Sequence, residues 1–122
     1  WQSALAEAAG APMKAIAAFY LSPTHRDNPE TGCVFAALGA DAARAGPDVK
    51  AAFEAGIESQ LALICESLVA EGMTPKAARA ASMASLSTLV GALVLSRAVN
   101  DPKLSGDILA AAGRSVASVP DG

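Results

Sequence analysis

The chain has few side chains capable of catalysis, and they are not clustered in the sequence. The one histidine, His25, lies in the segment SPTHRDNPET with Ser22, Thr24 and Asp27 nearby. A catalytic triad needs a nucleophile, a base and an orienting acid in a defined geometry, and a loop with two prolines predicts no such geometry. We therefore expect His25, Arg26 and Asp27 to tie this loop to helix ends by hydrogen bonds.

Metal, phosphate and redox motifs are also missing from the sequence. Cys33 and Cys65 fall on separate predicted helices without CxxC spacing, which favours reduced, buried thiols in a cytoplasmic protein and leaves a disulfide between them open. No His, Cys, Asp or Glu cluster suggests a metal site, and no phosphate-binding loop occurs. Glu54, Glu58 and Glu66 are expected on a helix exterior. The sequence predicts no enzyme, no cofactor and no metal.

Composition favours one helical domain. The chain has 122 residues, of which 52% are apolar and 4% aromatic. Alanine is abundant and favours helix because it loses no side-chain entropy there. The net charge of −3 comes without a basic cluster, so the chain itself is not expected to bind nucleic acid. It opens on Trp1 instead of an initiator methionine, which suggests a longer natural protein.

Breaking and capping residues divide the chain into five predicted helices. Gly46-Pro47 separates the second helix from the third, and Gly72 is the expected C-terminal cap of the third. Thr74-Pro75 and Asp101-Pro102 are pairs of an N-cap and a first-turn proline, which open the last two helices. No alternating strand pattern competes. The predicted helices span 12–21, 32–45, 47–71, 75–100 and 102–115, after a short alanine-rich piece at 2–9 and with a polar loop at 22–31.

The fourth helix contains a run without charge, from Ala80 to Ser96. With five hydroxyl side chains it falls short of the roughly 20 mostly apolar residues of a membrane span, so we expect no membrane contact. A helix that is apolar all round is buried all round. On a helical wheel, a bulky arc (Met83, Leu86, Leu89, Val90, Leu93, Val94) opposes a mostly small arc (Ala84, Ser85, Ser87, Thr88, Gly91, Ala92, Leu95, Ala98).

Two arrangements would bury both arcs. Either other helices of the same chain surround the fourth helix, with the fifth as a simple hairpin partner, or the small arc meets a second copy across a two-fold axis. We favour the second, in which the last two helices of two copies form a four-helix bundle crossing at about +20°. The predicted dimer interface consists of Ala84, Ser87, Thr88, Gly91, Leu95, Ala98, Leu104, Ile108 and Ala112.

The first four helices also offer the lining of an apolar pocket. Gln60 interrupts an apolar stripe, and a buried amide without partners costs about 1–3 kcal/mol. It therefore either meets water at the edge of the stripe or bonds a ligand, with Tyr20 as the second polar anchor. Ordinary core packing is the alternative for each aromatic side chain. The predicted ligand-binding residues are Ile16, Tyr20, Phe35, Leu38, Ile57, Gln60, Leu61, Ile64, Met83, Leu86 and Val90.

Two stretches resemble a known family. YLSPTHRDNPETGCVFAALGADAAR, residues 20–44, is similar to the first part of the C-terminal domain of TetR-type transcriptional regulators, and LVGALVLSRAVNDPKLSGDILAAAGRS, residues 89–115, is similar to its end. The most specific parts are the His25-Arg26-Asp27 loop leading to Gly32-Cys33 and the pattern from Gly91-Ala92 to Ser96-Arg97-Ala98. The likeness covers about residues 12–116.

The resemblance implies an all-α, five-helix domain whose last two helices form an intersubunit four-helix bundle. Residues 1–11 would be the remnant of a linker to an N-terminal helix-turn-helix domain absent from this chain, and residues 12–122 the ligand-binding and dimerisation domain of a cytoplasmic repressor. The implied partners are a second copy, a small and mostly apolar effector, and operator DNA through the missing domain. The alternatives are a structural dimerisation module without ligand and, more weakly, a small helical enzyme using His25.

Overall fold

A computed structural model of the chain describes residues 12–28 and 34–118. Within these ranges the chain is all-α and has no strand, and five helices of nine or more residues confirm the predicted class. The alanine-rich piece at 2–9 lies outside the described residues. The helices are α2 (Pro12–Tyr20), α3 (Pro23–Asp27), α4 (Val34–Ala43), α5 (Pro47–Ala70), α6 (Pro75–Ala98) and α7 (Pro102–Ala117).

The predicted caps of the long helices are confirmed. Thr74 Oγ1 accepts a hydrogen bond from the Ala77 amide at 3.3 Å, and Asp101 Oδ1 accepts one from the Lys103 amide at 3.0 Å. Gly72 has a φ of 111°, in the left-handed region where a Cβ is costly, so glycine ends α5 there. These signals are local, which is why the sequence places the helix ends within a few residues.

The prediction of an uninterrupted loop at 22–31 was wrong in its first half. Ser22 Oγ accepts a hydrogen bond from the His25 amide at 3.1 Å, and Pro23 is the first helical residue of α3. This is the same pairing of hydroxyl cap and proline that opens α6. The helix is only five residues long, and so short a helix depends on contacts with the rest of the domain.

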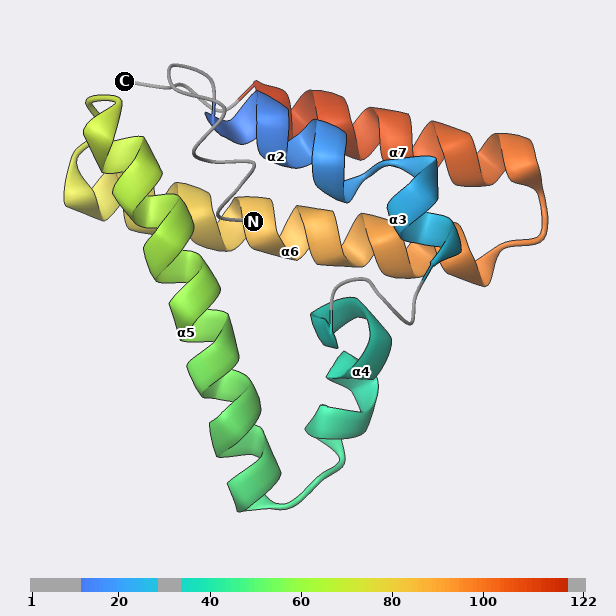
Figure 1. The fold of residues 1–122 in the computed structure, drawn as a ribbon, viewed down its shortest axis with the longest axis horizontal. Helices are drawn as coiled ribbons and strands as arrows, with labels where there is room; N and C mark the ends of the chain where they lie inside the picture. Colours follow the sequence, from blue (N-terminus) through green and yellow to red (C-terminus); the bar gives the residue numbers. More distant parts are fainter. Residues whose placement is uncertain (1–11, 29–33, 119–122) are drawn as a thin grey trace.

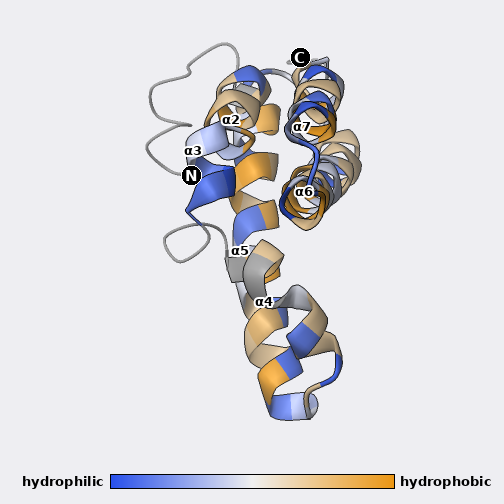
Figure 2. Ribbon diagram, turned by 90° about the vertical axis from the view of Figure 1, so that its right-hand side faces the viewer, coloured by the Kyte–Doolittle hydropathy of each residue, from blue (hydrophilic) through white to orange (hydrophobic). Residues whose placement is uncertain are grey.

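The helices form an upper group and a lower projection. In Figure 1, α6 and α7 run antiparallel, α2 lies along α7, and α5 rises from the lower tip of the molecule to the beginning of α6. In Figure 2, α6 and α7 lie side by side, α2 and α3 pack against them, and α4 projects below. In this projection α4 contacts both α5 and α6.

The core confirms part of the helical-wheel prediction. Leu86, Leu89 and Leu93 of the bulky arc are buried. Met83 and Val94, from the same arc, are exposed by 45% and 41%. The buried direction of α6 is thus rotated away from the centre of the bulky arc.

Small residues account for this rotation. The buried seam of α6 follows the 4-and-3 spacing of helix-on-helix packing and consists of Ala78, Ser82, Ser85, Leu89, Ala92 and Ser96. Ser85 and Ala92 were placed on the small, outward arc, so that part of the prediction was wrong. Short side chains let α7 approach closely, and Ser105 Oγ of α7 donates to the Ser96 carbonyl at 2.8 Å.

A surface ion pair ties α5 to α6. Arg79 donates to both carboxylate oxygens of Glu58, at 3.0 and 2.8 Å. Hydrogen bonding from Arg79 lowers the pKa of Glu58 below its usual value. Glu54 and Glu66 are exposed, as predicted. Of the three carboxylates, Glu58 therefore also connects α5 to α6.

Candidate functional site

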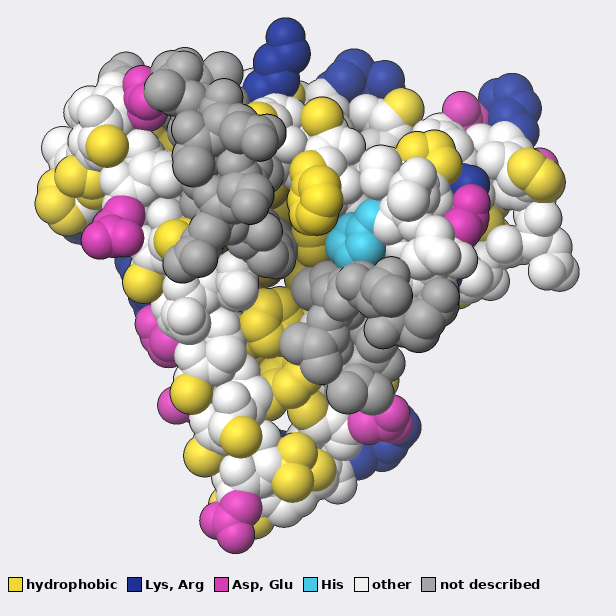
Figure 3. Space-filling model, in the orientation of Figure 1, with side chains coloured by type: hydrophobic (Ala, Val, Ile, Leu, Met, Phe, Trp, Pro, Cys, Tyr) yellow, Lys and Arg dark blue, Asp and Glu magenta, His cyan; other side chains and the backbone are white. Residues whose placement is uncertain are grey.

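A cleft of about 390 Å³ lies where α4, α5 and α6 meet. This size falls within the range of about 300–1,000 Å³ that small-molecule sites occupy. Apolar side chains are also visible in the depression between α5 and α4 on the face shown in Figure 3. The cleft is lined by Phe35, Gly39, Phe53, Ile57, Leu86, Ser87, Val90 and Gly91.

Two aromatic rings shape one wall of the cleft. Phe35 of α4 and Phe53 of α5 meet edge to face, with ring centroids 5.3 Å apart and an interplanar angle of 75°, a favourable geometry for aromatic pairs. A Cβ on Gly56 would lie 3.3 Å from the Phe35 ring, tighter than an ordinary contact. Glycine at position 56 therefore allows Phe35 to lie close against α5.

The predicted ligand-binding residues divide into three groups. Phe35, Ile57, Leu86 and Val90 line the cleft. Met83 and Gln60 do not line it, and the side chain of Leu38 lies outside the described part of the structure. The remaining four are buried in the core, and these are Ile16, Tyr20, Leu61 and Ile64.

Four lining residues were missing from the predicted ligand set. Phe53 belongs to the same apolar stripe of α5 as Ile57, so its spacing is a usable signal. Ser87 and Gly91 were assigned to the dimer interface, and Gly39 has no side chain that a pattern of apolar residues would detect. The sequence therefore predicts which helices form the pocket better than it predicts which residues line it.

Gln60 lies one helical turn beyond Ile57. Its Oε1 atom is buried and has no hydrogen-bond partner among the described residues. Buried acceptors without partners are rare in folded proteins and costly. The Oε1 atom is thus shielded from solvent, although Gln60 is not among the residues that line the cleft.

Replacing Gln60 by methionine, which has a similar length, should therefore stabilise the unliganded chain. We expect the free energy of unfolding to rise by about 1 kcal/mol, because a desolvated amide is removed without opening a cavity. Urea denaturation of Gln60→Met measures this. Glu54→Met, which replaces a side chain of similar length at an exposed position of the same helix, is the control and should change stability little. A clear loss of stability in Gln60→Met would show that the amide makes a necessary bond.

His25 is fixed by contacts within its own segment. Its Nδ1 atom lies 2.6 Å from the Tyr20 carbonyl oxygen, and its ring meets the Tyr20 ring edge-on at 4.7 Å. Ser22 Oγ accepts from the backbone amide of His25, so the nearest hydroxyl serves as a helix cap. In the described residues, no three His, Cys, Asp or Glu side chains group as metal ligands.

The predicted role of this loop as a tie between helix ends is confirmed. Arg97 of α6 donates to the carbonyl oxygens of Arg26 and His25, at 3.0 and 2.8 Å. Arg26 donates to Ser105 Oγ of α7 at 3.0 Å. Arg26 also pairs with Asp27, and its hydrogen bond lowers the pKa of that carboxyl group. Together these bonds hold α3 against the corner between α6 and α7.

The predicted dimer residues are covered to different degrees, and Ile108 and Ala112 pack against the core of the chain itself. Five of them are exposed, namely Ala84, Ser87, Leu95, Ala98 and Leu104, and four are half-buried, namely Thr88, Gly91, Ile108 and Ala112. The prediction that α6 falls short of a membrane span was wrong by length and composition, although core helices of soluble proteins pass the same test. Of its most apolar 18-residue window, 39% is buried within the chain, so much of this helix remains uncovered.

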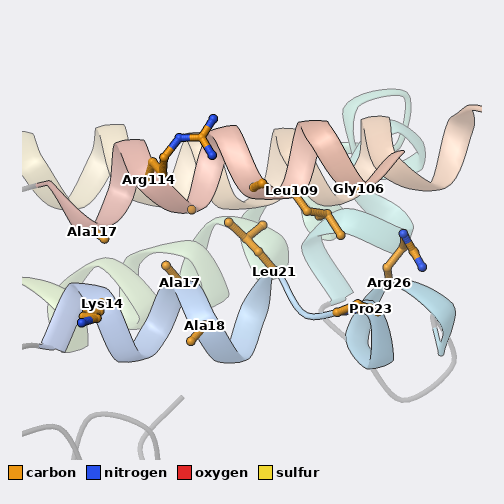
Figure 4. A pocket seen from close by; sticks show the side chains of 12 residues that line it. Lys14, Ala17, Ala18, Leu21, Pro23, Arg26, Gly106, Leu109, Arg114 and Ala117 are labelled. Atoms are coloured by element: carbon orange, nitrogen blue, oxygen red, sulfur yellow. The ribbon is translucent and has the colours of Figure 1, made fainter. Parts of the chain in front are cut away.

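A second cleft, of about 450 Å³, lies between α2 and α7 (Figure 4). Half of its lining residues are alanine or glycine, such as Ala17, Ala18 and Gly106, and none is aromatic. Arg114 points away from α2 in Figure 4. Lys14, Arg26 and Arg114 add positive charge to this lining, whereas the cleft beside the two phenylalanines has no charged side chain.

A family model described as the C-terminal domain of LmrA/YxaF-like transcriptional regulators matches residues 7–104. Neither a search of curated proteins nor a search of solved structures gives a match. The family model covers α2 to α6 and the first turn of α7, so it includes the cleft and the exposed side of α6. The predicted resemblance is confirmed, and so is the prediction that the chain is not an enzyme. The chain belongs to the TetR family of transcriptional regulators, as an LmrA/YxaF-like C-terminal domain.

Proposed function

We propose that residues 12–122 form the effector-sensing and dimerisation domain of a TetR-like repressor. The cleft among α4, α5 and α6 binds a small, mostly apolar ligand. Operator DNA is read in the cytoplasm by a helix-turn-helix domain outside these 122 residues, to which residues 1–11 link. The observation that carries the proposal is the cleft itself, since four side chains selected for ligand binding line it.

The lining defines the ligand class. Among the lining residues Ser87 has the one polar side chain, and none is charged. A charged ligand would lose its hydration there without a compensating partner. The edge-to-face phenylalanines favour a flat, aromatic or aliphatic body. A hydrogen-bond donor that reaches beyond Ile57 would meet the buried Oε1 of Gln60.

The mechanism follows from where the cleft lies. A ligand between α4, α5 and α6 is bound by groups from all three helices, and it shifts the domain only if it binds one arrangement of them better than another. α2 packs against α7 and α6, so a shift of α6 would reach α2 and, through it, the DNA-reading domain. The two DNA-reading domains then leave the spacing of about one helical turn that successive major grooves require, and operator affinity falls.

Filling the cleft tests the proposal. A Cβ on Gly39 would have one neighbour, the Phe53 ring at 4.0 Å, so Gly39→Leu adds apolar atoms to the cleft without a clash at the backbone. With the neutral fluorescent dye N-phenyl-1-naphthylamine as probe, we expect affinity to fall at least about tenfold, or about 1.4 kcal/mol. Leucine favours helix more than glycine does, so Gly39→Leu should not unfold α4.

Gly106→Leu is the matched control. A Cβ on Gly106 has open space, and this residue lines the cleft between α2 and α7 instead. It should leave dye binding unchanged. If Gly106→Leu blocks the dye and Gly39→Leu does not, the ligand site is the other cleft. If the dye does not bind the wild-type chain, the structural dimerisation module without ligand becomes the better interpretation.

A further inference from the structure

The opening of the cleft and the exposed side of α6 share two residues. Ser87 and Gly91 line the cleft. On the outer side of α6, Ser87 is exposed and Gly91 is half-buried. Whatever covers this side of α6 therefore also covers the opening of the cleft.

A second copy of the chain fits this surface. The sequence has no charge between Arg79 and Arg97, so two chains of net charge −3 can approach here without facing like charges. Leu95 of α6 and Leu104 of α7 are exposed by 56% and 46%. In a two-fold interface the same surface of each subunit meets its copy, so large side chains must face small ones. An α6 surface with both large and small side chains meets this requirement.

The spacing along α6 is symmetrical about Gly91. Counting from Ala84 through Ser87, Gly91 and Leu95 to Ala98, the intervals are 3, 4, 4 and 3 residues. In a two-fold contact each residue meets its mirror position in the partner. Two antiparallel α6 helices with their axis at Gly91 then place Leu95 on Ser87 and Ala84 on Ala98. A Cβ on Gly91 would meet nothing within 4 Å in the chain itself, which leaves room for a close backbone approach.

We propose that in this dimer the partner subunit's Leu95 packs over Ser87 and closes the ligand cleft of the neighbouring subunit. The inference rests on the proposed function, because it concerns the same cleft. Each binding site is then completed by the other chain. Ligand binding and dimer formation strengthen each other by the same factor, as linkage requires.

Cysteine cross-linking tests the geometry without any ligand. Gly91→Cys should form a disulfide-linked dimer under mild oxidation, since a residue on the axis faces itself within disulfide range. Ser87→Cys and Leu95→Cys should each fail to cross-link alone and should cross-link when the two chains are mixed. The wild-type chain and Ala62→Cys, at an exposed site on α5, are the controls. Failure of Gly91→Cys, or self-linking of Ser87→Cys, overturns the proposed axis.

Dye binding tests closure of the cleft. Leu95→Ala and Leu104→Ala both remove an exposed leucine from the predicted interface. Of the two leucines, only Leu95 is proposed to close the cleft of the partner, and we call it the lid. At concentrations where sedimentation shows a dimer, Leu95→Ala should bind N-phenyl-1-naphthylamine about tenfold more weakly than wild type, and Leu104→Ala should bind it normally. Saturating dye should tighten the wild-type dimer.

The outcomes separate the two proposals. If Gly39→Leu blocks the dye but Leu95→Ala binds it as wild type does, the lid is overturned and the ligand site stands. If the chain stays monomeric and binds dye in its Gly39-dependent cleft, both the lid and the dimer are overturned. If wild type binds no dye, the proposed function fails, and closure of a ligand site fails with it.

Discussion

Replacing Leu89 by alanine should lower the free energy of unfolding by about 3–5 kcal/mol, the usual cost of removing a leucine from a packed core. Leu89 is fully buried at the middle of the α6 seam, in the same core cluster as Ile16 and Leu68. α2, α5 and α6 all contribute side chains to this cluster, so α6 cannot shift to fill the void without loosening its packing against the other two helices. Typical domains have only about 5–15 kcal/mol of stability, so this change should remove a large part of the total.

Met83→Ala is the matched control for Leu89→Ala. Met83 lies on the same helix and belongs to the same predicted arc, but it is 45% exposed. We expect less than about 1 kcal/mol of destabilisation, since surface substitutions usually have small effects. Chemical denaturation of dilute samples measures both variants. Equal losses at the two positions would mean that α6 is rotated differently from the structure.

The contrast between these positions shows what the sequence determines. Helix ends at Gly72, Thr74 and Asp101 were predictable because caps act on amides and carbonyls within a few residues. The face that α6 buries was only partly predictable. A wheel distinguishes large from small side chains, but α6 uses Ser85 and Ala92 for close packing inside the domain, while Met83 lies outside.

The cleft was predictable to a similar extent. Ile57 and Leu86 were selected because they lie on apolar faces of long helices, and both line the cleft. Tyr20 was selected as a polar anchor, yet it is fully buried in the core instead. Whether an apolar side chain fills a core or borders a space depends on how far apart its neighbours are held. The distance between neighbouring helices cannot be predicted from the sequence. In this domain it is set where α4 meets the lower part of α5.

Replacing Arg97 by alanine should lower the free energy of unfolding by about 2–3 kcal/mol, because hydrogen bonds from a charged donor contribute about 1.5–3 kcal/mol. Arg97 donates to the carbonyl oxygens of His25 and Arg26. These groups lie in the last turn of α3, where helical carbonyls lack partners. Without the guanidinium, this five-residue helix loses its tie to α6, and the bond from Arg26 to Ser105 loses its support.

The expected loss is local, and its location distinguishes it from general unfolding. In Arg97→Ala, amide hydrogen exchange should accelerate over residues 23–28 while the centre of α6 stays protected. Arg97→Lys retains the charge but not the two-pronged geometry, and it should recover part of the stability. Arg44→Ala, at an exposed ion pair with Asp41, is the control and should cost less than about 0.5 kcal/mol. If Arg97→Ala is as stable as Arg44→Ala, the two hydrogen bonds from Arg97 do not hold α3 in place.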